Sequence, residues 1–161
     1  MAIPYRGNTG LSTYFITSST YQKKSLFQTT RMAELFMDVL MLYRKQDKYL
    51  LHEFVVMPDY FHLLITPAFT LEKALQLIKG GFSYRAKKEL GFGGEVWEHS
   101  FYDRRVRDLA EYDRFVTYIH QNPVRRRLAD SAADYLYSSG SGKYALDEVP
   151  QRLKPLTLRA G

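Results

Sequence analysis

Two polar side chains stand close together in the stretch VVMPDYFHLLITP, residues 55–67. Tyr60 and His62 alternate with apolar residues there, so on a β-strand both side chains point to one face of the sheet. An imidazole is a common metal ligand, and a phenol binds a metal well only after losing its proton. The stretch is therefore either a ligand-binding site or a sheet in which a tyrosine and a histidine are merely hydrogen-bonded.

A second group of polar side chains occupies the stretch YIHQNPVRRR, residues 118–127. Tyr118 and Asn122 meet on a helix because they are four residues apart, and Tyr118 lies roughly 110° from the centre of the apolar stripe. Tyrosine is among the side chains that form covalent intermediates, but its ordinary pKa of about 10 means that a metal ion or nearby cations must assist it. The nearby cations are Arg125, Arg126 and Arg127. The alternative is a half-buried surface tyrosine and an asparagine that ends the helix.

Further arginines lie among aromatic residues in HSFYDRRVR, residues 99–107, where they are Arg104, Arg105 and Arg107. A single strand of DNA suits such a surface, because its phosphates contact cations while its bases stack on rings. A run of charges is also commonly a solvated face, so which of these arginines contact DNA stays open. The net charge of +6 and the isoelectric point of about 9.4 favour a polyanionic partner.

The composition indicates one soluble domain over residues 1–161. No apolar run is long enough to span a membrane, and the first ten residues do not resemble a signal peptide. The absence of cysteine excludes disulfides and thiolate metal sites. We therefore expect a cytoplasmic protein without membrane contact.

Hydrophobic periodicity predicts the elements that would position these groups. Asp108 and Glu111 are spaced as in a capping box, Pro123 is expected to end the last helix, and the second helix resumes or bends at Gly80-Gly81. A core over about residues 11–139 would precede a basic C-terminal tail over about 140–161. In chain order the predicted elements are a strand over 11–20, a helix over 30–46, a β-hairpin over 49–67, a helix from about 70, an extended segment over 94–106 and a helix over 109–122. This order predicts an α+β fold of the ferredoxin-like type, with a central antiparallel sheet covered by helices.

Six ordered blocks of the chain resemble the REP-associated tyrosine transposases, a branch of the HUH superfamily of single-tyrosine transposases that act on single-stranded DNA. The resemblance covers about residues 13–139. It implies a ferredoxin-like core, 5′-phosphotyrosine chemistry with a divalent cation (Mg²⁺ or Mn²⁺), a single strand with a REP-like hairpin as the substrate, and a monomer or homodimer. The blocks are YFITSST, VVMPDYFHLLITP, IKGGFSYRAKKELG, VWEHSFYDRRVRD, YIHQNPVRRRLAD and YLYSS.

The resemblance also assigns roles to individual residues. It makes Tyr118 the nucleophile, Asn122 a side chain that helps to hold the cation, and His62 the second histidine of the HUH pair. The first histidine of that pair would stand at position 60, where this chain has Tyr60. Activity in this chain could therefore be impaired.

The departure at Tyr60 leaves several alternatives open. Glu53 could compensate as a ligand if it shares a face with His62, whereas the parity of His52 places it on the opposite face. A chain that has lost its chemistry would be a binding protein for single-stranded or hairpin DNA. An unrelated RNA-binding module of the RRM type is a third interpretation, but KGGFSY, residues 79–84, is only a loose echo of the motif that such modules carry.

Overall fold

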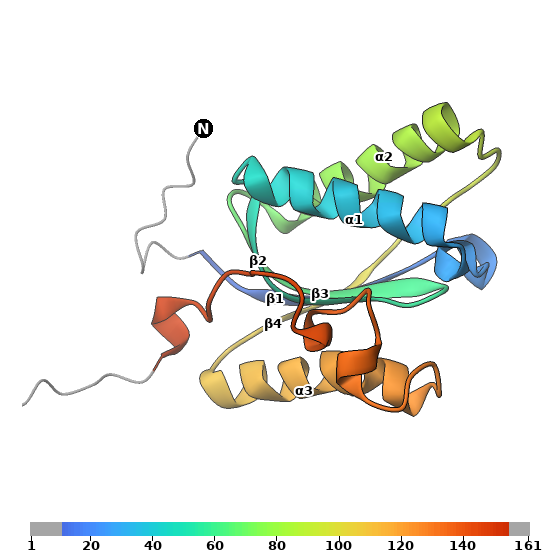
Figure 1. The fold of residues 1–161 in the computed structure, drawn as a ribbon. Helices are drawn as coiled ribbons and strands as arrows, with labels where there is room; N and C mark the ends of the chain where they lie inside the picture. The colour runs from blue at the N-terminus through green and yellow to red at the C-terminus, as the bar shows by residue number, and fades with distance from the viewer. Residues whose placement is uncertain (1–10, 155–161) are drawn as a thin grey trace, which may run out of the picture.

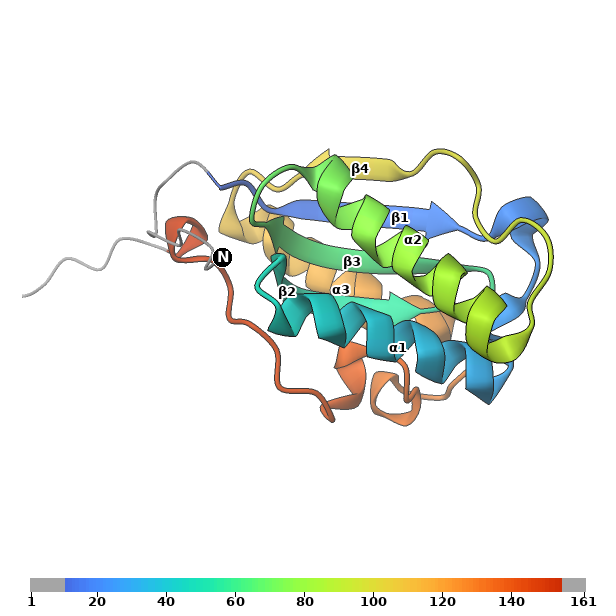
Figure 2. The same cartoon turned by 90° about the horizontal axis from the view of Figure 1, so that it is seen from above.

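The computed structural model describes residues 11–154, which fold as a four-stranded antiparallel sheet with helices on both faces. The strand order is β2-β3-β1-β4, so β3 and β1 are the inner strands and β2 and β4 are the edge strands. Helices α1 and α2 cover one face of the sheet, and α3 covers the other (Figures 1 and 2). This architecture confirms the predicted α+β fold. The elements are β1 (Tyr14–Ser19), α1 (Thr30–Lys45), β2 (Tyr49–Val56), β3 (Tyr60–Pro67), α2 (Leu71–Leu90), β4 (Tyr102–Arg105) and α3 (Leu109–Arg125).

Strand β3 shows how the alternating sequence builds two cores. Phe61, Leu63 and Ile65 are fully buried in the larger core beneath α1 and α2. The residues between them point the other way, so His62 and Leu64 face α3. Side chains that α3 brings to the sheet therefore meet the face that carries His62.

Threonine side chains cap the N-termini of the two helices that cover the larger core. Thr70 accepts a hydrogen bond from the Lys73 N–H, and α2 then runs without interruption through Gly80-Gly81 to Leu90. A Cβ atom on Gly81 would lie 2.9 Å from the ring of Tyr43 on α1, so glycine is what lets the two helices approach each other here.

Two sequence-based predictions were wrong in extent. The segment 94–106 forms strand only over Tyr102–Arg105, because Trp97 instead packs into the larger core and makes a single bridge to Thr20. Helix α3 continues past Pro123 to Arg125. A proline in the last turn removes only one backbone donor, and the N–H groups of Arg126 and Leu128 still close the helix on Asn122 and Pro123.

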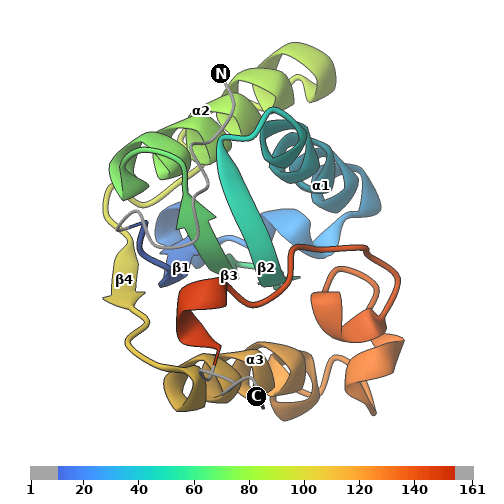
Figure 3. The ribbon, with the colours of Figure 1, turned by 90° about the vertical axis from the view of Figure 1, so that its left-hand side faces the viewer.

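The chain after α3 runs through three short 3-10 helices, the first two on the β2 side of the sheet and the third beside the segment that joins β4 to α3 (Figure 3). Asp147 fastens this return by accepting hydrogen bonds from the guanidinium of Arg44 and the N–H of Leu51. The last part of the predicted basic tail, 155–161, lies outside the described residues. No helix within 11–154 has the length and apolar character needed to cross a membrane. The 3-10 helices are η3 (Ala132–Asp134), η4 (Ser139–Ser141) and η5 (Gln151–Leu153).

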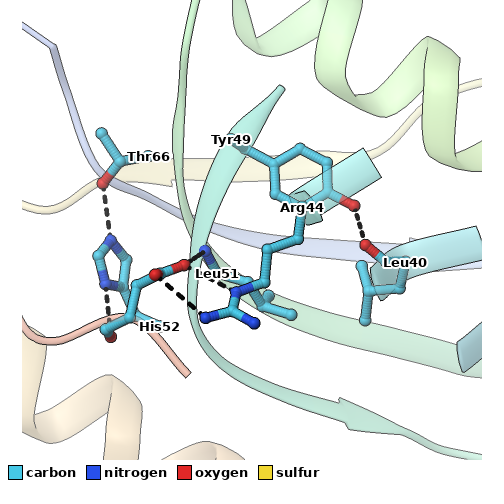
Figure 4. A network of polar contacts seen from close by, with 7 residues as sticks. Leu40, Arg44, Tyr49, Leu51, His52 and Thr66 are labelled. Carbon is cyan, nitrogen blue, oxygen red and sulfur yellow. Dashed lines mark hydrogen bonds and ion pairs between the residues drawn. The ribbon is translucent and has the colours of Figure 1, made fainter. Parts of the chain in front are cut away.

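The predicted parity of His52 was wrong, because β2 contains a bulge between Leu51 and Glu53. His52 hydrogen-bonds the Thr66 hydroxyl through Nε2 at 2.8 Å, as Figure 4 shows, and its ring meets Tyr112 of α3. The bulge thus leaves His52 on the same face as His62. Burial lowers the pKa of His52, so it is held as a neutral hydrogen-bonding group.

Candidate nucleic-acid processing site

Tyr60 and His62 lie side by side on the α3 face of β3, with ring centroids 4.9 Å apart. His62 is buried, and its Nδ1 lies 2.8 Å from the hydroxyl of Thr17, the residue directly opposite on β1. The imidazole is therefore held in one orientation by the neighbouring strand.

Helix α3 brings Asn122 against this pair. The helix is held on the sheet by Phe115, whose ring stacks on that of Phe15 in β1 with the ring centroids 4.4 Å apart. The Tyr60 hydroxyl donates to Asn122 Oδ1 at 2.5 Å, and Asn122 Nδ2 lies 3.4 Å from His62 Nε2. Because the amide nitrogen is a donor, His62 Nε2 is the acceptor and Nδ1–H donates to Thr17. We call the connected side chains of Thr17, His62, Asn122 and Tyr60 the buried polar network.

Tyr118 borders this network from one turn earlier on α3. Its ring centroid is 5.3 Å from that of His62 and 5.9 Å from that of Phe15, while the side chain remains 40% exposed. The guanidinium of Arg125 lies 4.3 Å from the Tyr118 ring centroid and donates to the Tyr118 carbonyl. An accessible phenol therefore stands beside a fixed cation.

Arg126 places a second cation at the other tyrosine. It pairs with Asp59 at 2.9 Å and lies 5.4 Å from the ring centroid of Tyr60. Arg127 is exposed and has a left-handed backbone, with φ of 59°. One arginine therefore lies at each tyrosine, Arg125 at Tyr118 and Arg126 at Tyr60.

Burial sets the protonation states of the network. It lowers the pKa of His62 to about 4, so the imidazole is neutral at neutral pH. Burial also raises the pKa of Tyr60, and this effect outweighs the opposing influence of Arg126. The network is therefore made of neutral groups.

These neutral groups do not fit a preformed site for a divalent cation. The donors facing one another are one imidazole nitrogen, one carboxamide oxygen and one protonated phenol, and each is already hydrogen-bonded to its neighbour. No group of three or more His, Asp or Glu side chains suited to a metal occurs within residues 11–154. Glu53 does lie on the His62 face, but its carboxylate contacts His120 Nε2 at 2.5 Å.

A second polar centre, at the start of α3, was only partly visible in the sequence. Asp108 accepts from the Glu111 N–H, as the capping-box spacing predicted. The side chain of Glu111 also accepts from the Arg104 guanidinium and from the Arg107 N–H. Burial acts to raise the pKa of Glu111, but these hydrogen bonds outweigh it and leave the pKa lowered. Sequence reasoning missed this role because Arg104 and Glu111 meet only once β4 has paired with β1 and α3 has packed on the same face of the sheet.

Comparisons with known proteins identify the family of the chain. The sequence pattern of the IS200-like transposase family matches residues 9–122. The chain belongs to that family. No curated protein gives a significant match.

Two solved structures share the fold. One is a REP-associated tyrosine transposase bound to a REP hairpin, with a TM-score of 0.69 and 17% identity over 92% of this chain and 93% of that one. The other is a protein of Deinococcus radiodurans R1 assigned as a transposase, with a TM-score of 0.52 and 22% identity over 76% of this chain and 95% of that one.

Proposed function

We propose that this chain is a single-stranded DNA transposase of the REP-associated branch, which cuts and rejoins hairpin-bearing strands through Tyr118. The observation that carries the proposal is the exposed Tyr118 phenol, held between Arg125 and the buried polar network in a member of the IS200-like transposase family. The fold likeness to a transposase bound to a REP hairpin supports the branch and the substrate class.

In the proposed reaction the Tyr118 oxygen attacks the scissile phosphorus. A phosphotyrosine P–O bond forms, the P–O3′ bond breaks, and the leaving 3′ oxygen takes up the proton that the phenol gives up. A second 3′-OH later attacks the same phosphorus and frees Tyr118. Arg125 and Arg126 would offset the charge that develops on the phosphate oxygens.

The divalent cation implied by the resemblance, Mg²⁺ or Mn²⁺, enters no step of this proposal. His62 and Asn122 are the residues that would contact it, but both are engaged in the network with Tyr60. Dependence on a cation therefore remains a prediction, as does the choice between monomer and homodimer.

The closed network favours one alternative function. A chain whose cation ligands are bonded to each other would still offer its arginines to DNA. It would then act as a binding protein for hairpin-bearing or single-stranded DNA, without cutting it.

One experiment separates the two functions. The protein is incubated with a labelled, hairpin-bearing single strand and Mg²⁺ or Mn²⁺, and covalent adducts are resolved on a denaturing gel. We expect an adduct that Tyr118→Phe abolishes with hairpin affinity nearly unchanged, while the exposed control Tyr84→Phe behaves as wild type. An adduct that persists in Tyr118→Phe would exclude Tyr118 as the nucleophile and make Tyr60 the next candidate. Tight binding with no wild-type adduct would leave the binding protein as the function.

A further inference from the structure

Three adjoining hollows lead from Tyr118 around the edge of the sheet. The first, of about 620 Å³, runs along α3 from Asp113 to Arg125 and includes Tyr118 in its lining. The second, of about 300 Å³, shares Tyr118 with the first and extends to Tyr102 and Arg104 on β4. The third, of about 600 Å³, shares Tyr102 and Arg104 with the second and ends at Arg152 of η5. Because neighbouring hollows share lining residues, they adjoin one another, and we call the series from Tyr118 to Arg152 the path.

The third hollow has the lining of an anion site. Its described lining residues include four arginines, Arg104, Arg105, Arg107 and Arg152, and one carboxylate residue, Asp103. All of Arg104, Arg105 and Arg107 are exposed, and Arg104 is paired with Glu111. The hollow therefore keeps an excess of positive charge.

Arg152 is the unusual member of this lining. Its Nε and Nη2 atoms are buried and have no hydrogen-bond partner among residues 11–154. The helix that carries it is fixed, because the neighbouring Leu153 packs in the smaller core with Val106. Figures 1 and 3 show η5 beside the segment that joins β4 to α3. Buried guanidinium donors without partners are costly, and an anion bound in the hollow that Arg152 lines would lower this cost by pairing with its charge.

We propose that the path binds the single strand beyond the scissile bond, and that the Arg152 hollow holds one of its backbone phosphates. Tyr102 lies between the two ends, on the α3 face of the edge strand, and is 56% exposed. Its ring is placed to stack on a base of the strand. This inference rests on the proposed function and adds to it a phosphate subsite remote from Tyr118.

The first test measures hairpin-strand affinity by fluorescence anisotropy over a series of salt concentrations. Arg152→Gln should lower affinity on the order of 10-fold at low salt, as expected for a lost charged hydrogen bond. It should also reduce the slope of log K against log salt by about 0.7, the share of one single-strand phosphate. Arg107→Gln changes an exposed side chain and should act in the same direction. Arg31→Gln, on the exposed start of α1, is the matched control and should change neither quantity.

The second test is independent of DNA. The side-chain Nε–H signals of ¹⁵N-labelled protein are followed by NMR during titration with inorganic phosphate, and the signal lost in Arg152→Gln should shift before those of arginines elsewhere. An unmoved Arg152 signal would overturn the subsite. So would Arg152→Gln with wild-type affinity and slope, provided that its thermal unfolding matches wild type; a destabilised variant leaves Arg107→Gln and the titration to decide. Failure of the proposed function looks different, because the Tyr118 adduct would then be absent while the Arg152 signal still shifts.

Discussion

Replacing Tyr60 by histidine tests whether the buried polar network stands where a cation would bind. In the wild-type protein a cation must break the 2.5 Å hydrogen bond from Tyr60 to Asn122 before it can reach the carboxamide oxygen. A net hydrogen bond is worth about 0.5–1.5 kcal/mol, which corresponds to a factor of roughly 2–10 in affinity. Tyr60→His removes this competitor and adds a second imidazole beside His62.

The added imidazole contributes more than the removed competitor. Loss of a residue that only supports a metal ligand costs about 10–100-fold in affinity, and a direct ligand should contribute at least as much. Together the two effects predict that Tyr60→His binds Mn²⁺ on the order of 20- to 1,000-fold more tightly than wild type.

The assay is a titration of DNA-free protein with Mn²⁺, in which electron paramagnetic resonance reports the free ion. Tyr60→His should bind in the measured range, and His62→Ala should abolish binding in that background. Cleavage by Tyr60→His should also begin at lower Mn²⁺ or Mg²⁺ concentration than cleavage by wild type. If Tyr60→His gains neither cation affinity nor cleavage, this part of β3 is not a metal site, and the binding-protein alternative becomes the better explanation.

Three further predictions concern binding and stability. Hairpin-strand affinity should fall steeply between low and physiological salt in anisotropy titrations, because bound counterions are released; a flat response, or tighter binding to plain duplex, would contradict the substrate class. The pKa of His52 lies below its ordinary 6.5, so as the pH drops below about 6.5 His52 takes up a proton in the unfolded chain before it does so in the folded protein. The folded protein therefore loses stability, and the urea midpoint should fall with pH, less so in His52→Gln. Gly81→Ala should destabilise by about 1–2 kcal/mol, because its Cβ would lie 2.9 Å from Tyr43, whereas Gly80→Ala, with open space, should stabilise by about 0.5–1 kcal/mol; equal urea midpoints would refute this.

Sequence periodicity was enough to predict the order of strands and helices, since each apolar stripe needs a partner surface. It could not locate the bulge in β2, because the strand YLLHEFVV has apolar residues on both faces and shows no clear alternation for an inserted residue to interrupt. The parity of His52 was therefore misassigned. The prediction that the last helix ends before Pro123 was wrong for a different reason. A proline in the last turn removes one backbone hydrogen-bond donor, which costs little stability in a helix that ends two residues later.

The candidate site was predictable in part. Helical spacing already placed Tyr118 beside Asn122, and strand alternation placed Tyr60 beside His62. Their meeting across the chain depends on how α3 packs on the sheet, and only the structure shows the hydrogen bond between Tyr60 and Asn122. Arg152 had no sequence signal, because its significance comes from buried donors that lack partners rather than from a motif.

The positions of these groups predict that cation binding and DNA binding can be changed separately. The buried polar network lies beneath Tyr118, whereas the arginines of the path are at or near the surface. Tyr60→His should therefore change the cation requirement of adduct formation with little effect on hairpin affinity. Arg152→Gln should lower affinity yet give the normal Tyr118 adduct at saturating DNA. A Tyr60→His protein that lost affinity as strongly as Arg152→Gln would show that the network also supports the DNA-binding surface, and the two parts would then have to be treated as one site.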